Sequence, residues 1–214
     1  MAKDNLAGNR PGIDHEIEFW KGFVESERFK TNWLSSPNPE MALYPELQKA
    51  IAEKLPGPVL DLGCGVISYM RGSVRPLYQC DLLAHYYGQF FDYQAHGEEK
   101  PQAIAGESLL EAFGAGFFSL INISNALDHC QDPALVMDQA EACLIPGGTL
   151  IVHGFENEAS FENWNGLHQW NLSVGGKELY LSDKDGLKHI WTAAETWMRQ
   201  IYAGKIWIGA KFVK

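Results

Sequence analysis

The stretch VLDLGCG, residues 59–65, decides the fold class of this chain. A short apolar strand runs directly into a turn that contains Gly63 and Gly65. Glycine lets a backbone turn tightly and approach a ligand closely, so this turn is typical of nucleotide-binding α/β sheets. Asp81 lies 20 residues after Asp61, where an acid at the end of the next strand can accept hydrogen bonds from both ribose hydroxyls of a nucleoside. The sequence therefore predicts a nucleoside site at the carboxyl ends of parallel strands.

Strands and helices alternate on both sides of this motif. Four further apolar runs predict strands: 77–81, 102–106, 117–124 and 149–155. Apolar residues at three- and four-residue steps predict a helix from Asp14, and proline positions predict helices over 45–55 and 133–144. Strand, helix and strand in repetition indicate a parallel sheet covered by helices on both faces. We expect a Rossmann-like, doubly wound α/β fold with a mostly parallel, seven-stranded sheet and an antiparallel last strand.

The pattern changes after Phe155. A long loop over 156–176 is followed by a predicted hairpin over 178–192, expected to cover an acceptor pocket, and by a final strand over 206–213. Residues 193–203 fit a helix or a strand equally well. We expect a flexible tail (1–12) and one domain (13–214), divided into a helical lid (13–55), a cofactor-binding core (56–155) and an acceptor-side region (156–214).

Composition excludes several classes of protein. The length of 214 residues suits one domain, and 46% apolar with 21% charged residues is ordinary for a globular chain. Lys and Arg number 17 against 27 Asp and Glu, and the net charge of −10 argues against a nucleic-acid partner. No apolar run approaches the roughly 18 residues of a membrane span. The first residues lack the apolar segment of a signal peptide, so we expect a cytoplasmic protein with no membrane partner.

The four cysteines point to no metal or disulfide framework. They are Cys64, Cys80, Cys130 and Cys143, and none forms a C-x-x-C pair. Without a secretory signal we expect all four to be reduced thiols.

The glycine turn discriminates between nucleotides. A dinucleotide fingerprint would place a third glycine where this chain has Ser68, and Asp61 would repel a pyrophosphate. An acid at this position suits a ligand with a positive charge or an amine. S-adenosylmethionine carries both.

Residues 59–153 resemble the class I S-adenosylmethionine-dependent methyltransferases. VLDLGCG looks like their first motif, Asp81 like their ribose-binding acid, and Glu107 in AIAGESL like the residue near the adenine. SNALDH (124–129) is similar to the segment that ends their fourth strand, and CLIPGGTLIV (143–152) to the turn before their fifth. The resemblance implies S-adenosyl-L-methionine as cofactor, with these contact residues: Asp61, Gly63, Cys64, Gly65, Asp81, Leu82, Glu107, Ser108 and Asn125. EIEFWKGF, NALDHCQDP and GLHQWN together resemble bacterial members associated with sugar or surface-glycan pathways.

Three histidines follow the fourth and fifth predicted strands. His129 suits a general base that takes a proton from a hydroxyl, and His168 in GLHQWN is the second catalytic candidate. His153, Trp170 and Asn171 are the candidate acceptor-binding residues, since aromatic and polar side chains together suit a sugar-like ring. Each has a structural alternative: His129 as a cap, His153 as a satisfied core histidine, and the tryptophan-rich loop as a seal on the core.

A divalent metal is a weaker possibility. Asp128, His153, Glu156 and Glu158 could converge, but their spacing is not diagnostic, so we predict no metal.

These patterns favour methyl transfer to a small polar acceptor, with a sugar-type hydroxyl first among O- and N-acceptors. A non-catalytic protein that binds S-adenosylmethionine and a nicotinamide-dependent oxidoreductase remain alternatives. Ser68 and Asp61 argue against the oxidoreductase. The sequence leaves the acceptor atom and the oligomeric state open.

Overall fold

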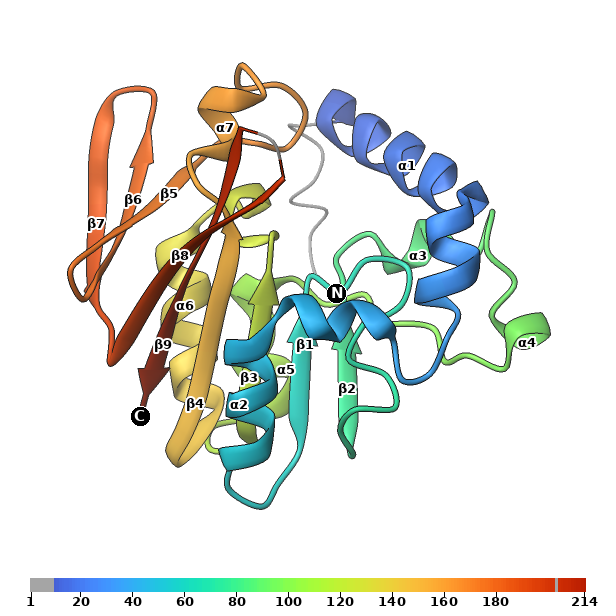
Figure 1. Ribbon diagram of the computed structural model, residues 1–214, viewed down its shortest axis with the longest axis horizontal. Coiled ribbons are helices and arrows are strands. Elements are labelled where there is room, and N and C mark those ends of the chain that lie inside the picture. Colours follow the sequence, from blue (N-terminus) through green and yellow to red (C-terminus); the bar gives the residue numbers. More distant parts are fainter. Residues whose placement is uncertain (1–9, 203) are drawn as a thin grey trace.

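The computed structural model describes residues 10–202 and 204–214, and within them it is built on two β-sheets (Figure 1). The central sheet has the strand order β2-β1-β3-β4-β9-β8, and β5-β6-β7 form a smaller sheet. The central strands are β1 (Val59–Leu62), β2 (Leu77–Cys80), β3 (Phe118–Ser124), β4 (Leu144–Phe155), β8 (Glu195–Tyr202) and β9 (Lys205–Val213). The smaller sheet contains β5 (Asn171–Gly175), β6 (Glu178–Asp183) and β7 (Gly186–Thr192).

Helices and short turns of helix connect the strands. The α-helices are α1 (Arg10–Glu25), α2 (Pro45–Glu53), α3 (Ala84–Tyr87), α4 (Tyr93–His96), α5 (Leu109–Phe113), α6 (Pro133–Cys143) and α7 (Glu158–Phe161). The remaining turns are η2 (Phe29–Trp33), η3 (Pro39–Leu43), η4 (Gly106–Ser108) and η5 (Leu127–His129). Within the described residues, no helix combines the length and the apolar character that crossing a bilayer requires.

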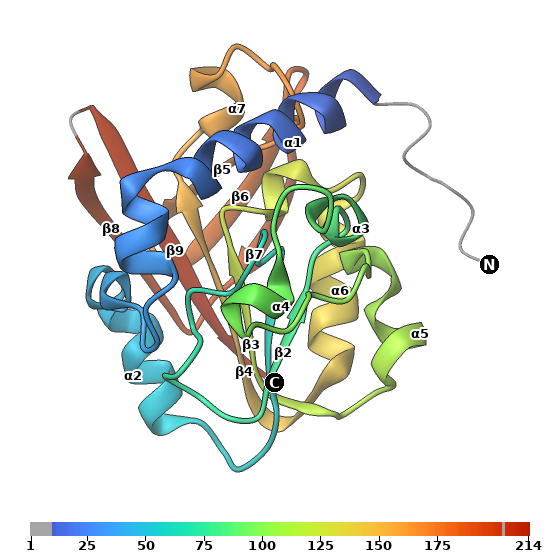
Figure 2. The same cartoon turned by 90° about the vertical axis from the view of Figure 1, so that its right-hand side faces the viewer.

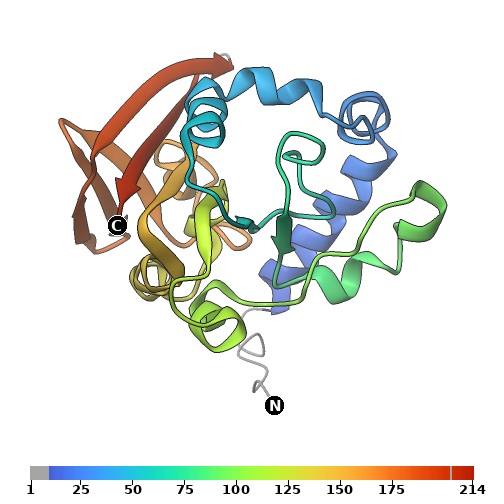
Figure 3. The same cartoon turned by 90° about the horizontal axis from the view of Figure 1, so that it is seen from below.

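Apolar residues of the parallel strands alternate between two cores, because successive side chains in a strand point to opposite faces. Leu120 and Ile151 pack with Leu47 of α2 on one face of the sheet. Ile121 and Val152 belong to the other core, which α6 covers. Figure 3 looks along the strands and shows α2 and α6 on opposite faces. This arrangement confirms the predicted doubly wound α/β fold.

The carboxyl ends of the parallel strands gather at one edge of the sheet. Strands β2, β1, β3 and β4 pair in parallel. Helices α1 and α7 lie beyond the ends of these strands (Figures 1 and 2). The apolar side of α1, with Ile17 and Trp20, packs onto Val66 and Tyr87 at this edge. Ligands of open α/β sheets bind here, so this edge positions the candidate site.

The prediction of seven strands in the central sheet is wrong for the described residues, which contribute six. The predicted strand at 102–106 is reduced to a single parallel bridge between Gln102 and Cys80. Pro101 has no N–H to donate to a ladder, and the N–H of Ile104 turns back to the carbonyl of Gln102 at 2.9 Å. Pairing therefore ends after one residue.

The region after Phe155 is more regular than its sequence indicates. The predicted loop at 156–176 contains α7 and β5. The predicted hairpin is the β6–β7 pair, with Asp183 opposite Gly186 at its turn. It packs beside β9 and α6 rather than over the strand ends (Figure 1), so the expectation that it covers the acceptor pocket is wrong.

The C-terminal strand is antiparallel to β4, as predicted, and the ambiguous segment 193–203 contains β8. Residue 203 and the first nine residues of the predicted tail lie outside the described part of the chain. Helix α1 begins at Arg10, four residues before the predicted start at Asp14.

Candidate functional site

The glycine turn after β1 is folded against the end of β2. Gly63 and Gly65 have φ angles of +71° and +67°, which L-residues rarely adopt. The N–H groups of Gly63 and Cys64 donate to the carbonyl of Cys80 at 2.8 and 3.2 Å. A methyl group at Gly63 would overlap the side chain of Ala126, so the turn lies directly against the segment that follows β3.

Asp81 lies beneath this turn and anchors it. Its Oδ2 accepts a hydrogen bond from the N–H of Gly65 at 2.9 Å. Its Oδ1 accepts from the N–H of Leu83 and from the hydroxyl of Tyr87, each at 2.9 Å. Burial raises the pKa of Asp81 although these three donors oppose the effect. The predicted ribose-binding acid is thus at the strand edge, next to the half-exposed Leu82, and it also organises the loop around it.

Helix α1 covers the glycine turn. A methyl group at Gly65 would overlap the ring of Trp20, and the Trp20 and Tyr87 ring centroids are 6.0 Å apart. Nε1 of Trp20 donates to Glu16 at 2.9 Å, one turn earlier on the helix. Trp20 of the predicted helical lid therefore lies directly on the predicted cofactor loop.

Asp61 is buried rather than open to a ligand, with 1% of its surface exposed. Its carboxylate accepts hydrogen bonds from the hydroxyl of Ser68 at 2.5 Å and from Nδ2 of Asn122 at 2.7 Å. Burial raises the pKa of Asp61 to about 6, against the two hydrogen bonds that oppose it. The structure therefore gives Asp61 a role in holding the turn to the sheet and does not support direct ligand contact.

His153 is a hydrogen-bonded histidine of the core, which was its structural alternative in the sequence analysis. Trp207 Nε1 donates to its Nδ1 at 3.3 Å, and its Nε2 lies 3.2 Å from the hydroxyl of Tyr69. Since Nδ1 accepts, Nε2 carries the proton. Burial lowers the pKa of His153 to about 3, so the ring is neutral. The structure does not support its predicted contact with an acceptor.

Glu107 and Asn125 accept hydrogen bonds that hold the loops at the carboxyl ends of the strands. Glu107 Oε1 accepts from the N–H groups of Gln131 and Asp132 at 3.0 and 3.2 Å. Asn125 has φ +49° and accepts from the N–H of Phe155 at 3.1 Å. Ser108 ends the short turn η4, next to Glu107. These predicted cofactor residues lie at the correct edge.

His129 and His168, predicted separately, are in contact through Asp128. Oδ2 of Asp128 lies 2.7 Å from Nδ1 of His168 and 3.4 Å from Nε2 of His129. The two ring nitrogens are 3.1 Å apart. Asp128, His129 and His168 are named the histidine cluster below, and their three ligating atoms are close enough to hold a metal ion.

Asp128 and His168 shift one another's pKa values. Burial acts to raise the pKa of Asp128, but His129 and His168 outweigh it and hold the pKa below its ordinary value. Burial acts to lower the pKa of His168, but the hydrogen bond and the charge of Asp128 outweigh it and raise the pKa. Asp128 is therefore a carboxylate that favours a cation beside it.

The loop that carries His168 is fixed by its neighbours. Trp170 Nε1 donates to the carbonyl of Cys130 at 2.9 Å, and Asn171 bonds both the N–H and the hydroxyl of Ser160, at 2.9 and 2.6 Å. These contacts bring the 158–171 segment onto the residues after β3. The structure shows Trp170 and Asn171 as supports of the loop.

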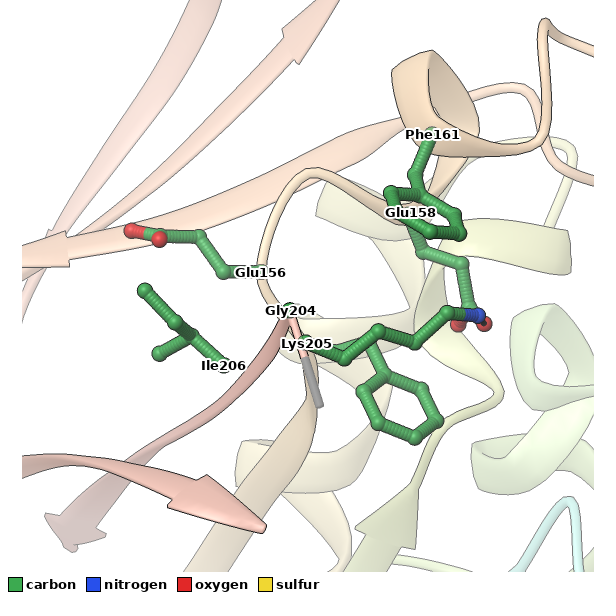
Figure 4. Close-up of a pocket in the computed structure, with 7 residues that line it drawn as sticks. Glu156, Glu158, Phe161, Gly204, Lys205 and Ile206 are labelled. Atoms are coloured by element: carbon green, nitrogen blue, oxygen red, sulfur yellow. Dashed lines mark ion pairs between the residues drawn. The ribbon is translucent and has the colours of Figure 1, made fainter. Parts of the chain in front are cut away.

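A small cavity of about 90 Å³ opens between α7 and the start of β9 (Figure 4). Its lining includes Glu158 and Phe161 of α7, together with Phe155 and Lys205. Nζ of Lys205 lies 4.8 and 4.4 Å from the ring centroids of Phe155 and Phe161, and 3.9 Å from Oε1 of Glu158. Sequence reasoning missed Lys205 because only the β4–β9 pairing brings it to α7.

The proposed metal grouping of the sequence is only partly assembled. Asp128 acts electrostatically on Glu158, and so do His129 and His168, which were not part of that grouping. His153 is bonded inside the core, as described above.

Comparisons with known proteins agree with the geometry. The sequence model described as "Methyltransferase domain" matches residues 40–195. The N-methyltransferase NodS of Bradyrhizobium japonicum, solved with S-adenosyl-L-homocysteine, superposes with a TM-score of 0.58 over 95% of this chain and 98% of NodS, at 15% identity. A SAM-dependent methyltransferase from Aquifex aeolicus gives 0.50 over 92% and 98% of the two chains, at 11% identity. At such identities the likeness shows the fold. No curated protein matches the sequence.

Proposed function

This chain belongs to the methyltransferase-domain family, whose model spans most of it, and we propose that it transfers a methyl group from S-adenosyl-L-methionine to a small polar acceptor. The proposal rests above all on one contact, that of Gly63 against Ala126. Through it the cofactor turn touches the segment that ends in the histidine cluster. A donor bound on the turn and an acceptor bound at the cluster are therefore neighbours.

The cofactor half of the site is the carboxyl edge around the glycine turn. We propose the backbone of Gly63, Cys64 and Gly65 for close approach to the cofactor and Asp81 for the ribose hydroxyls. Leu82, Glu107, Ser108 and Asn125 complete this half. Asp61 supports it from within the core. S-adenosyl-L-methionine also agrees with the family and with the ligand of NodS.

We propose a division of labour along the chain that keeps the predicted boundaries. Residues 13–55 form the lid, because α1 lies on the glycine turn. Residues 56–155 form the cofactor-binding core, and 156–214 supply His168, Glu158 and Lys205 on the acceptor side.

The acceptor half is the histidine cluster. We favour a hydroxyl acceptor because methylation of a hydroxyl requires loss of its proton, and this cluster can accept one. Asp128 accepts a hydrogen bond from Nδ1 of His168 at 2.7 Å, which leaves Nε2 of His168 as a proton acceptor. The closer approach of Asp128 to His168 favours His168 as the base.

In the proposed step, a lone pair of the acceptor oxygen attacks the sulfonium methyl. The O–C bond forms as the C–S bond breaks, its electron pair returns to sulfur as a neutral thioether, and the hydroxyl proton passes to the cluster. The protein contributes mainly alignment of the two reactants. A sugar hydroxyl or glycan precursor is our first candidate, supported by the resemblance of the NALDHCQDP and GLHQWN segments.

The test is release of S-adenosylhomocysteine from S-adenosylmethionine with a panel of acceptors that includes nucleotide sugars, simple alcohols and amines. Turnover with hydroxyl acceptors supports the proposal, and turnover with amines alone would replace O-methylation by N-methylation. Tight cofactor binding without turnover on any acceptor would indicate a non-catalytic binding protein. Binding of a nicotinamide cofactor in place of S-adenosylmethionine would overturn the proposal.

A further inference from the structure

The three polar atoms of the histidine cluster form a nearly closed triangle. Its sides are 2.7 Å from Asp128 Oδ2 to His168 Nδ1, 3.1 Å from His168 Nδ1 to His129 Nε2, and 3.4 Å from His129 Nε2 back to Asp128 Oδ2. Each atom therefore has two polar neighbours at or near hydrogen-bond distance. Three side chains from two segments of the chain aim their donor or acceptor atoms at one point.

Protons satisfy only two of the three contacts. If only Nδ1 of His168 carries a proton, this N–H serves both Asp128 and His129, and lone pairs of Asp128 Oδ2 and His129 Nε2 are left 3.4 Å apart. If both imidazoles donate to Asp128, the His129 and His168 nitrogens meet as two N–H groups. If His129 instead donates to His168, Nδ1 of His168 has no proton for Asp128, and two lone pairs face one another at 2.7 Å. A single cation between the three atoms would satisfy all of them at once.

The size of the triangle fits a coordinated metal ion. Imidazole nitrogen and carboxylate oxygen bind Zn²⁺ at about 2.0–2.2 Å, which sets neighbouring ligands about 3.0 Å apart in octahedral and about 3.4 Å apart in tetrahedral geometry. The observed sides of 3.1 and 3.4 Å match these values, and the 2.7 Å side between Asp128 and His168 would lengthen by a few tenths of an ångström around an ion.

Glu158 is an independent indication of a missing ligand. Its side chain is 7% exposed, and Oε2 makes no hydrogen bond to any part of the chain that the structure describes. Asp128, His168 and His129 all act electrostatically on this carboxylate, so it faces the cluster. The one ammonium paired with it here, that of Lys205, lies 3.9 Å from the other oxygen and bonds Glu162 at 3.1 Å. One oxygen of this buried carboxyl group is therefore left without a hydrogen-bond partner.

We propose that Asp128, His129 and His168 bind one divalent transition-metal ion, with Zn²⁺ as the reference ion, and that the charge of Glu158 supports the ion from outside the ligand set. Two imidazoles with a carboxylate suit Zn²⁺, Fe²⁺ or Co²⁺, whereas Mg²⁺ and Ca²⁺ favour oxygen ligands alone. Three protein ligands leave further coordination positions on the ion for a water molecule or an acceptor hydroxyl. A metal-bound hydroxyl loses its proton more readily, and the two histidines then serve as ligands rather than as bases.

Metal binding is tested on the full chain without any methyl acceptor. The protein is stripped with a chelator and titrated with Co²⁺, followed by its visible absorption, and with Zn²⁺ by calorimetry. We expect about one equivalent to bind, and His168→Ala, His129→Ala and Asp128→Asn each to weaken Zn²⁺ binding by roughly 100-fold or more. Glu158→Gln should weaken it by about tenfold. His189→Ala, an exposed histidine of β7, is the matched control and should leave affinity unchanged.

Two further measurements keep the result interpretable. Thermal unfolding of each metal-free variant shows whether it folds, and a variant that folds with unchanged Zn²⁺ affinity overturns the site. Binding of S-adenosylhomocysteine to the stripped protein should be unaffected, because none of the three metal ligands is among the proposed cofactor contacts. If the stripped protein binds no metal yet transfers methyl groups, the metal site is refuted while the proposed function stands. If the protein binds Zn²⁺ but transfers no methyl group to any acceptor, the metal site stands and the proposed function is refuted.

Discussion

Asp61→Asn should stabilise the protein in a pH-dependent way. Burial raises the pKa of Asp61 to about 6 from an ordinary 3.8, so above pH 6 the folded protein must hold an ionised carboxylate that water would solvate better. One pKa unit corresponds to about 1.4 kcal/mol, which makes this penalty roughly 3 kcal/mol at pH 8. Asparagine cannot ionise, and it can still accept from Asn122 while it donates to Ser68.

The sign of the effect follows from proton binding. The folded state holds the Asp61 proton more tightly than the unfolded chain, so stability falls as pH rises from about 4 to about 6 and stays low above that. The advantage of Asp61→Asn should therefore be roughly 2 kcal/mol larger at pH 8 than at pH 4.5.

Urea denaturation at the two pH values measures this difference. Asp92→Asn, which removes an exposed carboxylate at the start of α4, is the control for loss of one negative charge. An Asp61→Asn advantage that is the same at pH 4.5 and pH 8 would show that Asp61 is not the buried, hard-to-ionise group described above.

Three further predictions concern the two halves of the site. Asp81→Ala should weaken S-adenosylhomocysteine binding at least about tenfold by calorimetry, since charged hydrogen bonds to the ribose are lost; unchanged affinity in a folded variant would remove Asp81 from the site. His168→Ala and His129→Gln should lower turnover by roughly 10²–10⁴-fold without changing cofactor affinity, and His189→Ala should leave both unchanged. Equal turnover in all three variants would show that neither His168 nor His129 takes part in removal of the acceptor proton. Trp20→Ala should speed association of S-adenosylhomocysteine in stopped-flow measurements, because Trp20 covers the glycine turn; a slower rate would mean that Trp20 helps to build the site.

The fold followed from local sequence patterns where those patterns were strong. The apolar strand before Gly63 and the helix between Pro133 and PGG lie where they were predicted, because each carries its own start and stop signals. The strand predicted at 102–106 is reduced to one bridge, because strand pairing needs backbone N–H groups and Pro101 has none to donate. The 193–203 segment could not be assigned because its strand, β8, exists only through pairing with β9.

The candidate site was predictable as a place and less so as a set of contacts. Strand ends meet at one edge, so His129 and His168 could be assigned to it from sequence alone. Their meeting at Asp128 depends on the path of the loop that α7 and Trp170 fix. The sequence also predicts His153 at this edge. Its partners Tyr69 and Trp207 come from distant segments of the chain, and no local pattern reveals them.

Because β9 pairs with β4, the two sides of the site are completed at different times during synthesis of the chain. While the chain is being synthesised, everything around the glycine turn is present once β4 has emerged from the ribosome. The acceptor side must wait, because the N–H of Glu156 bonds the carbonyl of Ile206 at 2.9 Å and Lys205 reaches α7 only from the start of β9. The cavity beside α7 is therefore the last part of the site to be completed during synthesis, after the strands around the glycine turn.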